Sequence, residues 1–402
     1  MKILFVGSLI KDSTIDMIVK KSKVKPSNAP VYFEKMLVKG LVENGAQVTV
    51  LSVPTVSMYP NGSLLAWGRK KETLDFGQRV TWIPCINLMF FKQLTTRFCS
   101  FFEIATWTIR NRNEKGNIIL NYSVYPPYSS TTQLLGKLFH VKTCSIITDL
   151  PEYLYKMGHS EGLRAALNEY YSRQMVKYQG GYDQYVFLTE HMAGRMKLED
   201  KPSIVMEGFA DLSIFDNVGN VAKNGKKTVM YAGRLSEDFN IRALINGFMQ
   251  TNEDYELWIF GSGDMEQYIK ECATKDLRIT FFGKVERKNL LQHMKMAHLL
   301  ISVKSPYEDH ANYAFPSKVL EYMASGTAVA STNVGGIPKE YFQYIMAIDG
   351  DTAEDISACL SQAFAHSEEE LSIMGIKCRE YVLSQKNYQH QTKRIMKLFE
   401  LE

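Results

Sequence analysis

Residues 312–329, NYAFPSKVLEYMASGTAV, bring together groups that could bind an anion at the start of a helix. Pro316 suits the first helical position, where its missing N–H costs nothing. Phe315 cannot cap that helix, so the amides of residues 317–319 are left as hydrogen-bond donors, reinforced by the helix dipole. Lys318 adds a full positive charge. We therefore predict that this helix start binds an anionic group such as phosphate.

Glu321 lies on the polar side of the same predicted helix, together with Ser317 and Ser325. A carboxylate at this position could accept two hydrogen bonds from a diol that lies beside a bound phosphate. The same spacing also fits a surface ion pair between Lys318 and Glu321, on a helix that starts in water. Both interpretations stay open at this point.

Further strand ends carry glycine or basic residues. Arg234 follows Gly233 in YAGRLSEDF, where a guanidinium can hold phosphate oxygens with two parallel hydrogen bonds. Gly261 lies in the turn IFGSGD, a pattern that is also common in ordinary tight turns. The segment FFGKV offers the Val285 backbone, and NVGGIP (333–338) allows close approach of a ligand to the backbone. Together these strand ends favour one pocket for a nucleoside diphosphate.

Short apolar runs alternate with helical patterns along the whole chain, which indicates an α/β fold with parallel sheets covered by helices. The pattern restarts at Thr228 after a polar segment. We predict two Rossmann-like, doubly wound domains facing across a cleft, an N-terminal one over 1–205 and a C-terminal one over 206–384. The amphipathic segment 385–402 is expected to pack back on the first. In such sheets ligands bind beyond the carboxyl ends of the strands.

The composition narrows the classes of partner. A chain of 402 residues is long for one core, and its net charge of +4 suits anionic small ligands or a membrane surface rather than nucleic acid. The six scattered cysteines indicate free thiols in a reducing compartment. Without a segment of signal-peptide form or a spanning stretch, we expect a cytoplasmic protein, with possible peripheral contact at the inner face of the plasma membrane.

Residues 88–112 form the most aromatic stretch, with basic residues interleaved. One interpretation is an interfacial helix that docks on a membrane. The other, which we favour from the spacing, is a core helix: Phe90, Leu94, Phe98 and Phe101 recur at intervals that place them on one packed face.

The second half of the chain resembles the nucleotide-sugar-binding domain of family 4 retaining glycosyltransferases with the GT-B fold. The matching segments are YAGRLS, IRALINGF, LWIFGSGDMEQYI, ITFFGKVERKNLLQHMKMAHLLISV, FPSKVLEYMASGTAVAST and VGGIPKEY. MKILFVGS, NGAQVTVL, ITDLPEY and VMEGFAD match more loosely in the first half. The resemblance covers most of the chain, most strongly residues 204–341, and FPSK with TDLPEY is similar to a bacterial polysaccharide-biosynthesis type.

The resemblance implies a hexosyltransferase that uses a nucleoside-diphosphate-sugar donor and a glycan or polyprenyl-linked acceptor. Arg234 would hold the diphosphate and Glu321 the ribose hydroxyls, while the Val285 backbone would contact the base. The backbone of Phe315, Pro316, Ser317, Lys318 and Val319 would receive the diphosphate and sugar. Similar enzymes usually need no divalent metal, so we expect no metal and no cofactor.

The chain departs from the family pattern at several positions. Tyr313 stands where the first of two glutamates is expected, so the sugar-contacting acid would be absent or supplied by Glu308 or Asp309. Phe239 stands where a second phosphate-binding lysine is common, and Lys318 could substitute for it. In the first half, Thr148 replaces a histidine, and Asn28 with its neighbour replaces a Gly-Gly pair.

We expect the acceptor to contact Gly7, Asn28, Thr148 and Asp149. The catalytic candidates are Arg234, Lys318 and Asp149, although Asp149 also fits a helix cap before Pro151. His191 is expected to be a first-turn helix residue. The alternative function is a non-catalytic GT-B subunit that binds acceptor and supports another transferase. A sugar phosphorylase or nucleotide-sugar epimerase is a third possibility on a similar fold.

Overall fold

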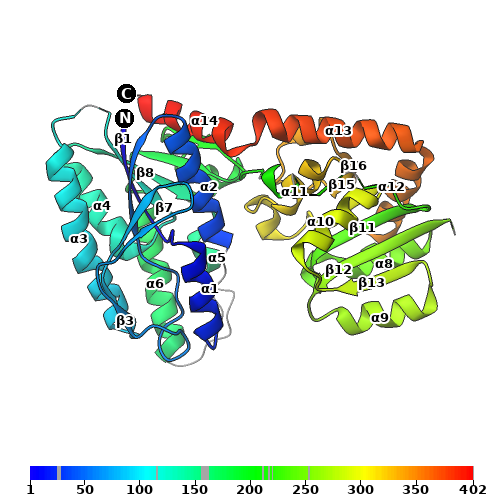
Figure 1. Ribbon diagram of the computed structural model, residues 1–402, viewed down its shortest axis with the longest axis horizontal. Coiled ribbons are helices and arrows are strands. Elements are labelled where there is room, and N and C mark those ends of the chain that lie inside the picture. Colours follow the sequence, from blue (N-terminus) through cyan, green and yellow to red (C-terminus); the bar gives the residue numbers. More distant parts are fainter. Residues whose placement is uncertain are drawn as a thin grey trace. The chain divides into compact units, whose positions relative to one another are not determined.

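The computed structural model of the protein describes residues 1–24, 29–114, 116–154, 163–210, 212–215, 218–219, 221–251 and 254–401. These residues form two compact α/β units, both drawn in Figure 1. The N-terminal unit comprises Met1–Leu188, Met192–Met206 and Tyr388–Glu402, and the C-terminal unit comprises Thr189–His191 and Glu207–Asn387. The chain therefore returns to its first unit after completing the second.

The N-terminal unit is built on a sheet with the strand order β10-β9-β8-β7-β1-β2-β5-β4. Its neighbouring strands are parallel except β4, which runs antiparallel to β5. Central strand β1 (Lys2–Gly7) is apolar on both faces, with Ile3, Leu4, Phe5 and Val6 fully buried. Such runs need helices on both sides of the sheet, which is what the alternation in the sequence predicts.

The other elements of this part of the chain have the following bounds. The strands are β2 (Gln47–Ser52), β4 (Lys71–Thr73), β5 (Arg79–Trp82), β7 (Ile118–Tyr122), β8 (Lys142–Ile147), β9 (Gln184–Phe187) and β10 (Ser203–Val205), with a separate two-stranded antiparallel sheet of β3 (Ala66–Trp67) and β6 (Cys85–Ile86). The helices are α1 (Asp12–Lys21), α2 (Ala29–Glu43), α3 (Phe91–Asn111), α4 (Pro126–Phe139), α5 (Pro151–Leu154), α6 (Leu163–Gln179), α7 (His191–Met196) and α14 (Tyr388–Glu400). His191 is the first residue of α7, as predicted.

The last helix, α14, packs on α2 within the N-terminal unit. Gly40 permits the close approach, because a Cβ there would lie 2.5 Å from Thr392 Oγ1. The amide of Asn44 donates hydrogen bonds of 2.9 Å to the Gln389 carbonyl and to Thr392 Oγ1. Gln184 Nε2 donates another, of 2.8 Å, to the Leu398 carbonyl. These polar contacts fix the position of α14 along the unit.

The C-terminal unit is a second, wholly parallel sheet with the order β13-β12-β11-β14-β15-β16. Its strands are β11 (Lys227–Arg234), β12 (Tyr255–Ser262), β13 (Ile279–Gly283), β14 (Leu299–Ser302), β15 (Ala328–Thr332) and β16 (Met346–Ile348). Its α-helices are α8 (Ile241–Met249), α9 (Glu266–Lys275), α10 (Arg287–Met296), α11 (Lys318–Ser325), α12 (Ala353–Ala365) and α13 (Glu368–Gln385). Short 3-10 helices are η1 (Leu212–Phe215), η2 (Glu237–Phe239), η3 (Asp309–Asn312) and η4 (Lys339–Gln343). Read along the chain, this is the doubly wound order 3-2-1-4-5-6 of dinucleotide-binding folds.

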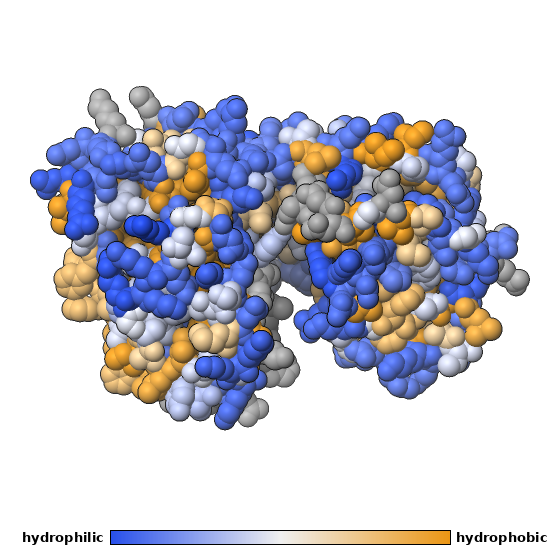
Figure 2. Space-filling model, viewed as in Figure 1, coloured by the Kyte–Doolittle hydropathy of each residue, from blue (hydrophilic) through white to orange (hydrophobic). Residues whose placement is uncertain are grey.

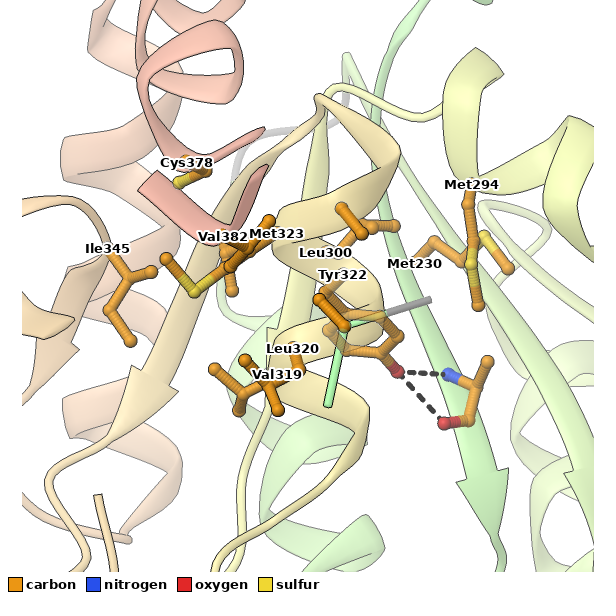
Figure 3. Packing of buried hydrophobic residues seen from close by; sticks show 14 of the residues in the cluster. Met230, Met294, Leu300, Val319, Leu320, Tyr322, Met323, Ile345, Cys378 and Val382 are labelled. Carbon is orange, nitrogen blue, oxygen red and sulfur yellow. Dashed lines mark hydrogen bonds between the residues drawn. The ribbon is translucent and has the colours of Figure 1, made fainter. Parts of the chain in front are cut away.

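Two apolar clusters cover the two faces of this sheet, and β11 contributes alternate residues to each. Met230 joins the cluster that holds α11, and Val229 joins the cluster on the other side. Figure 3 shows the first cluster, in which Val319, Leu320 and Met323 of α11 lie among the buried residues of the sheet and of α13. The prediction of an α/β fold with two Rossmann-like domains is thus confirmed.

Buried charges join the two ends of the C-terminal unit. Lys386 Nζ lies 2.8 Å from Glu207 Oε1 and 2.7 Å from Glu340 Oε1, and the Lys386 and Glu207 side chains are only 5% and 4% exposed. The Lys386 ammonium also lies 5.0 Å from the centre of the Tyr341 ring. Because Glu207 opens this part of the unit and Lys386 nearly closes it, the ion pair holds together the two chain segments that lead to the other unit.

Replacing Lys386 by methionine is expected to lower the free energy of unfolding by about 3 kcal/mol, because it leaves the Glu207 carboxylate buried without its cation. Urea denaturation followed by circular dichroism measures the change. Lys275→Met, at an exposed lysine of α9, is the control and should alter stability by less than about 0.5 kcal/mol. Equal stabilities for the two variants would contradict the role given to the buried pair.

Helix α3 corrects the interpretation that we favoured for residues 88–112. Its buried side chains include Thr96, Ser100, Ile104 and Trp107, whereas Leu94 and Phe98, assigned to the packed face, are 66% and 65% exposed. Phe90 and Phe101, the other two residues of that predicted face, are exposed as well. The prediction failed because it assumed that the aromatic stripe faces the core. The helix instead packs its small hydroxyl side inward, beside α4.

Candidate functional site

The strand order of the C-terminal unit defines where a ligand is expected. β11 and β14 are neighbours, and the chain winds away from them in opposite directions, so the crevice at their carboxyl ends is the topological switch point of the sheet. Arg234 is the last residue of β11, and Lys304 follows β14 by two residues. Helix α11 begins at the same edge, with Lys318 as its first residue.

A tyrosine fixes α11 against the end of β11. β11 pairs with β14 only at Val229 and Met230, so the backbone of Ala232 has no strand partner on that side. Tyr322 Oη takes the place of one: it accepts a hydrogen bond of 2.8 Å from the Ala232 N–H and donates one of 2.9 Å to its carbonyl (Figure 3). The start of α11 is therefore held at the switch point by a fully buried side chain.

The helix start differs in detail from the prediction. Pro316 is not the first helical residue: α11 begins at Lys318, because the Pro316 carbonyl closes a turn by accepting a hydrogen bond of 2.8 Å from the Val319 N–H. The prediction of a donor at Val319 was therefore wrong. The N–H groups of Ser317 and Lys318 make no hydrogen bond within the described part of the chain, and no side chain caps the helix. Two amide donors remain for an anion.

The Lys318 side chain lies over aromatic rings. Its ammonium donates a hydrogen bond of 2.9 Å to Tyr231 Oη, and it lies 4.1 Å from the centre of the Tyr231 ring and 5.2 Å from that of Phe239. Burial, together with the charge of Lys304, lowers the pKa of Lys318 to about 7. Phe239, which stands where a phosphate-binding lysine was expected, thus forms part of the wall around the Lys318 ammonium.

Two glycines make room for this lysine. A Cβ on Gly233 would lie 2.8 Å from Lys318 Nζ, and a Cβ on Gly261 would lie 1.8 Å from the Gly233 carbonyl oxygen. The two glycines are register partners on β11 and β12. Any side chain at Gly261 would push the end of β11 toward the lysine, so the glycine in the turn IFGSGD has a packing reason in addition to any contact with a ligand.

The switch point carries positive charge that no carboxylate pairs with directly. Arg234 is exposed, and among the described residues none forms an ion pair with Arg234, Lys304 or Lys318. Burial lowers the pKa of Lys304, while Glu308 and Asp238 act in the opposite direction through their charge. Two partly desolvated lysines, one arginine and two amide donors form a site that favours a multiply charged anion.

Glu321 pairs with Arg287, which the sequence analysis did not single out. Arg287 Nη2 lies 2.5 Å from Glu321 Oε1, so the predicted surface pair between Lys318 and Glu321 is not formed. Burial raises the pKa of Glu321, and Arg287 counteracts the rise. The Glu321 side chain remains 23% exposed. Its second oxygen can accept hydrogen bonds, which keeps the predicted contact with a diol chemically possible.

The loop after β13 is lined by aromatic rings. Phe282 stacks on Phe260 with ring centres 4.3 Å apart and planes 5° from parallel, and Val285 lies partly buried against the same cluster. Gly283 takes a positive φ of 65°, which turns the chain at the strand end. Val285 therefore lies just after this turn, beside partly buried aromatic residues; its contact with a base stays a prediction.

The segment before α11 places Tyr313 after η3, and buries Phe315 against the Tyr341 ring with centres 5.5 Å apart. Of the two acids considered as substitutes at Tyr313, Glu308 is the one whose charge acts on Lys304. Glu308 Oε2 also lies 3.1 Å from His310 Nε2. The substitute acid that acts on the cations of the site is therefore Glu308, in the loop after β14, rather than a residue at position 313.

A second group of polar residues lies at the carboxyl ends of strands in the N-terminal unit. Glu34 of α2 is fully buried and accepts hydrogen bonds of 2.7 Å from the Ser8 N–H and 2.6 Å from Ser8 Oγ. Gly7 is needed for this arrangement, because a Cβ there would lie 2.5 Å from Glu34 Oε2. Burial raises the pKa of Glu34 to about 8, although these hydrogen bonds favour the ionised form. The sequence analysis missed Glu34, which occupies the amide donors that follow β1.

Thr148 and Asp149 follow β8 at the same edge. Burial raises the pKa of Asp149, and a hydrogen bond with Thr148 counteracts this rise. Burial raises the pKa of the Tyr122 hydroxyl at the end of β7, and the charges of Glu34 and Asp149 add to this rise. Asn28, the fourth residue predicted on the acceptor side, lies outside the described residues. The contacts of Gly7, Thr148 and Asp149 with an acceptor stay predictions.

Comparison with known proteins agrees with this geometry. Residues 226–366 match the family model described as Glycosyl transferases group 1, a range that contains the switch-point residues. The fold is that of GT-B glycosyltransferases. No curated protein sequence matches the chain.

Solved structures that are similar to the whole chain include the following three. Sucrose-phosphate synthase from Thermosynechococcus elongatus is 13% identical with a TM-score of 0.59, over 99% of this chain and 98% of that one. The E. coli trehalose-6-phosphate protein bound with UDP-2-fluoro glucose is 10% identical with a TM-score of 0.64, over 100% of both chains. Anabaena HepE in complex with UDP is 11% identical with a TM-score of 0.56, over 99% of both chains. At these identities the similarity establishes the fold.

Two expectations from composition can be compared with the structure. All six cysteines lie in described segments and are free, five of them buried, in agreement with the prediction of unpaired thiols. Across the described ranges, no helix combines the length and the apolar character that crossing a bilayer would take.

Proposed function

We propose that the protein transfers a sugar, with retention of configuration, from a nucleoside-diphosphate-sugar donor to a glycan or polyprenyl-linked acceptor. The observation that carries the proposal is the group of cations at the switch point of the C-terminal unit, for which the described residues provide no ion-pair partner: Arg234, Lys304 and Lys318, beside two amide donors. A diphosphate supplies the negative charge that this group lacks. We further propose that this transfer takes place in the cytoplasm and serves the synthesis of cell-surface polysaccharide.

In the proposed reaction the bond between the anomeric carbon and the leaving phosphate oxygen breaks, and the acceptor hydroxyl oxygen bonds to that carbon. The hydroxyl proton passes to the departing diphosphate. Arg234 and Lys318 stabilise the charge that develops on the leaving group, with the amides of residues 317 and 318. Because these cations balance the diphosphate, the proposal includes no divalent metal and no cofactor. Asp149 and Thr148 contact the acceptor hydroxyl.

Arg234→Ala and Glu321→Ala test the site assignment. Each variant is expected to lose transfer activity by a factor of about 100 or more while it keeps the melting temperature of the wild type, because both side chains lie at the surface of the site. The measurement is release of nucleoside diphosphate in the presence of donor and acceptor, after a thermal-shift panel of nucleotide sugars has identified the donor. Normal kinetics in both variants would rule out this site.

A specific observation supports one alternative. Tyr313 and Phe239 stand at positions where the resemblance predicts an acid and a lysine, so a non-catalytic subunit that binds acceptor and supports another transferase is the second candidate. Donor turnover by the purified chain alone would exclude it. Binding of a nucleoside diphosphate without turnover, in the presence of a full acceptor panel, would favour it over the enzyme.

A further inference from the structure

Helix α3 presents an aromatic stripe to solvent, and the stripe runs along its whole length. Its residues are Phe91, Leu94, Phe98, Phe101, Phe102 and Ile109, which are between 36% and 66% exposed. Phe98 and Phe102 pack against each other, with ring centres 4.8 Å apart. Figure 2 shows apolar surface on the part of the N-terminal unit where Figure 1 draws α3.

The inward side of this helix combines small hydroxyl residues with two buried apolar ones, Ile104 and Trp107. Its inward side includes Thr96, Ser100 and Thr108, and the hydroxyls of Ser100 and Thr108 donate to the carbonyls four residues earlier. Small hydroxyl side chains permit close packing, and the hydrogen bonds satisfy them within the helix. The exposed apolar residues of the stripe therefore lie on a face of α3 that the fold leaves uncovered.

The charges beside the stripe leave an excess of positive charge. The acids on and just after α3 are neutralised, since Glu103 pairs with Arg69 at 2.5 Å and Glu114 pairs with Lys2 at 2.5 Å. The exposed cations Arg97 and Arg110 of α3 form no ion pair with any residue that the structure describes. The adjacent helix α4 adds an exposed lysine, Lys137, and two exposed leucines, Leu134 and Leu138.

We propose that this face, the α3 stripe with its flanking cations, docks on the surface of an anionic lipid bilayer. A helix of 21 residues is about 30 Å long, and it carries apolar residues along one side and charged residues beside them, as helices that lie in the plane of a membrane do. Apolar side chains enter the boundary of the acyl chains while the arginines contact lipid phosphates.

A second copy of the chain is the other possible occupant, and the charges argue against it. In a two-fold symmetric pair, Arg97 and Arg110 of one protomer would lie close to the same residues of its partner, and the described residues of this face include no unpaired acid to compensate. An anionic bilayer supplies negative charge instead. This inference goes beyond the proposed function, because docking requires neither donor nor acceptor.

Flotation with lipid vesicles tests the inference in the absence of any nucleotide. The probes are vesicles of phosphatidylcholine and phosphatidylglycerol in equal parts, with pure phosphatidylcholine as comparison. We expect the wild type to float with the anionic vesicles and to be released by high salt. The double variant Phe98→Ser, Phe102→Ser should bind about tenfold more weakly or worse, since two rings no longer enter the bilayer.

The matched control is Ile373→Ser, Ile376→Ser, which removes two apolar residues of α13 that are 45% and 50% exposed in the C-terminal unit. It should bind vesicles like the wild type, and both double variants should keep the wild-type melting temperature. Failure of the wild type to float, equal binding by the α3 double variant, or a wild-type dimer that this variant dissociates would each overturn the proposal. None of these results would bear on sugar transfer.

Discussion

Replacing Lys318 by methionine is expected to weaken the binding of UDP-glucose by about 3 kcal/mol, roughly a hundredfold in Kd, because the ammonium is the most deeply buried cation of the proposed diphosphate site. Methionine fills a similar volume between the rings of Tyr231 and Phe239, so the fold should be kept. Isothermal calorimetry measures the affinity of both proteins.

Lys377→Met is the matched control, since it removes an exposed lysine from α13. Its affinity for UDP-glucose should equal that of the wild type. An affinity of Lys318→Met within about threefold of the wild type would show that the diphosphate does not lie at the start of α11, because a buried charge–phosphate contact is worth far more than that.

The affinity for a nucleotide sugar is expected to fall as the pH rises above 7. Burial lowers the pKa of Lys318 to about 7 in the free protein, and only the protonated form attracts the diphosphate. Binding must therefore be accompanied by proton uptake at higher pH, and Kd should rise about tenfold per pH unit above 7 and stay level below it. The lowered pKa of Lys304 acts in the same direction.

UDP-glucose suits this measurement because its diphosphate carries substituents at both ends and does not titrate near neutral pH. Calorimetry in buffers of different ionisation enthalpy would report the proton uptake directly. Tyr231, whose pKa is raised by burial, stays neutral throughout and does not contribute. A Kd that is constant between pH 6 and 9 would contradict the assignment, as would an equal pH dependence in Lys318→Met.

Much of the fold could be predicted from local patterns. Apolar runs such as KILFVG and KTVMYAGR indicate strands that are buried on both faces of a sheet. The helical segments between such runs indicate that the strands are parallel. The glycines at strand ends and the basic residues Arg234 and Lys318 are equally visible in the sequence, because they interrupt these runs at regular places.

Helix α3 shows where local patterns fail. A stripe of aromatic residues at helical spacing is the same in sequence whether it faces a core or a membrane. Only the packing of Thr96, Ser100 and Thr108 toward the protein decides between the two. A run of small hydroxyl residues at the same spacing on the opposite side was the available indication.

The site residues that were missed depend on tertiary structure. Lys304 follows an ordinary buried strand, and its relation to Lys318 arises because the sheet order brings β14 beside β11. Arg287 of α10 pairs with Glu321 of α11, 34 residues later in the sequence, and local patterns do not predict this contact. Glu34 lies in the middle of α2, where a lone acid usually indicates the solvent side rather than a fully buried position.

Hydrogen–deuterium exchange with and without saturating UDP tests the central claim most directly, because it locates the nucleotide on the chain. The account predicts slower exchange in residues 231–236 and 315–321, where the β11 end and the start of α11 meet, with α3 unchanged. Unchanged exchange throughout, or protection confined to residues 7–9 and 148–150 of the N-terminal unit, would contradict a diphosphate site at the switch point of the C-terminal unit.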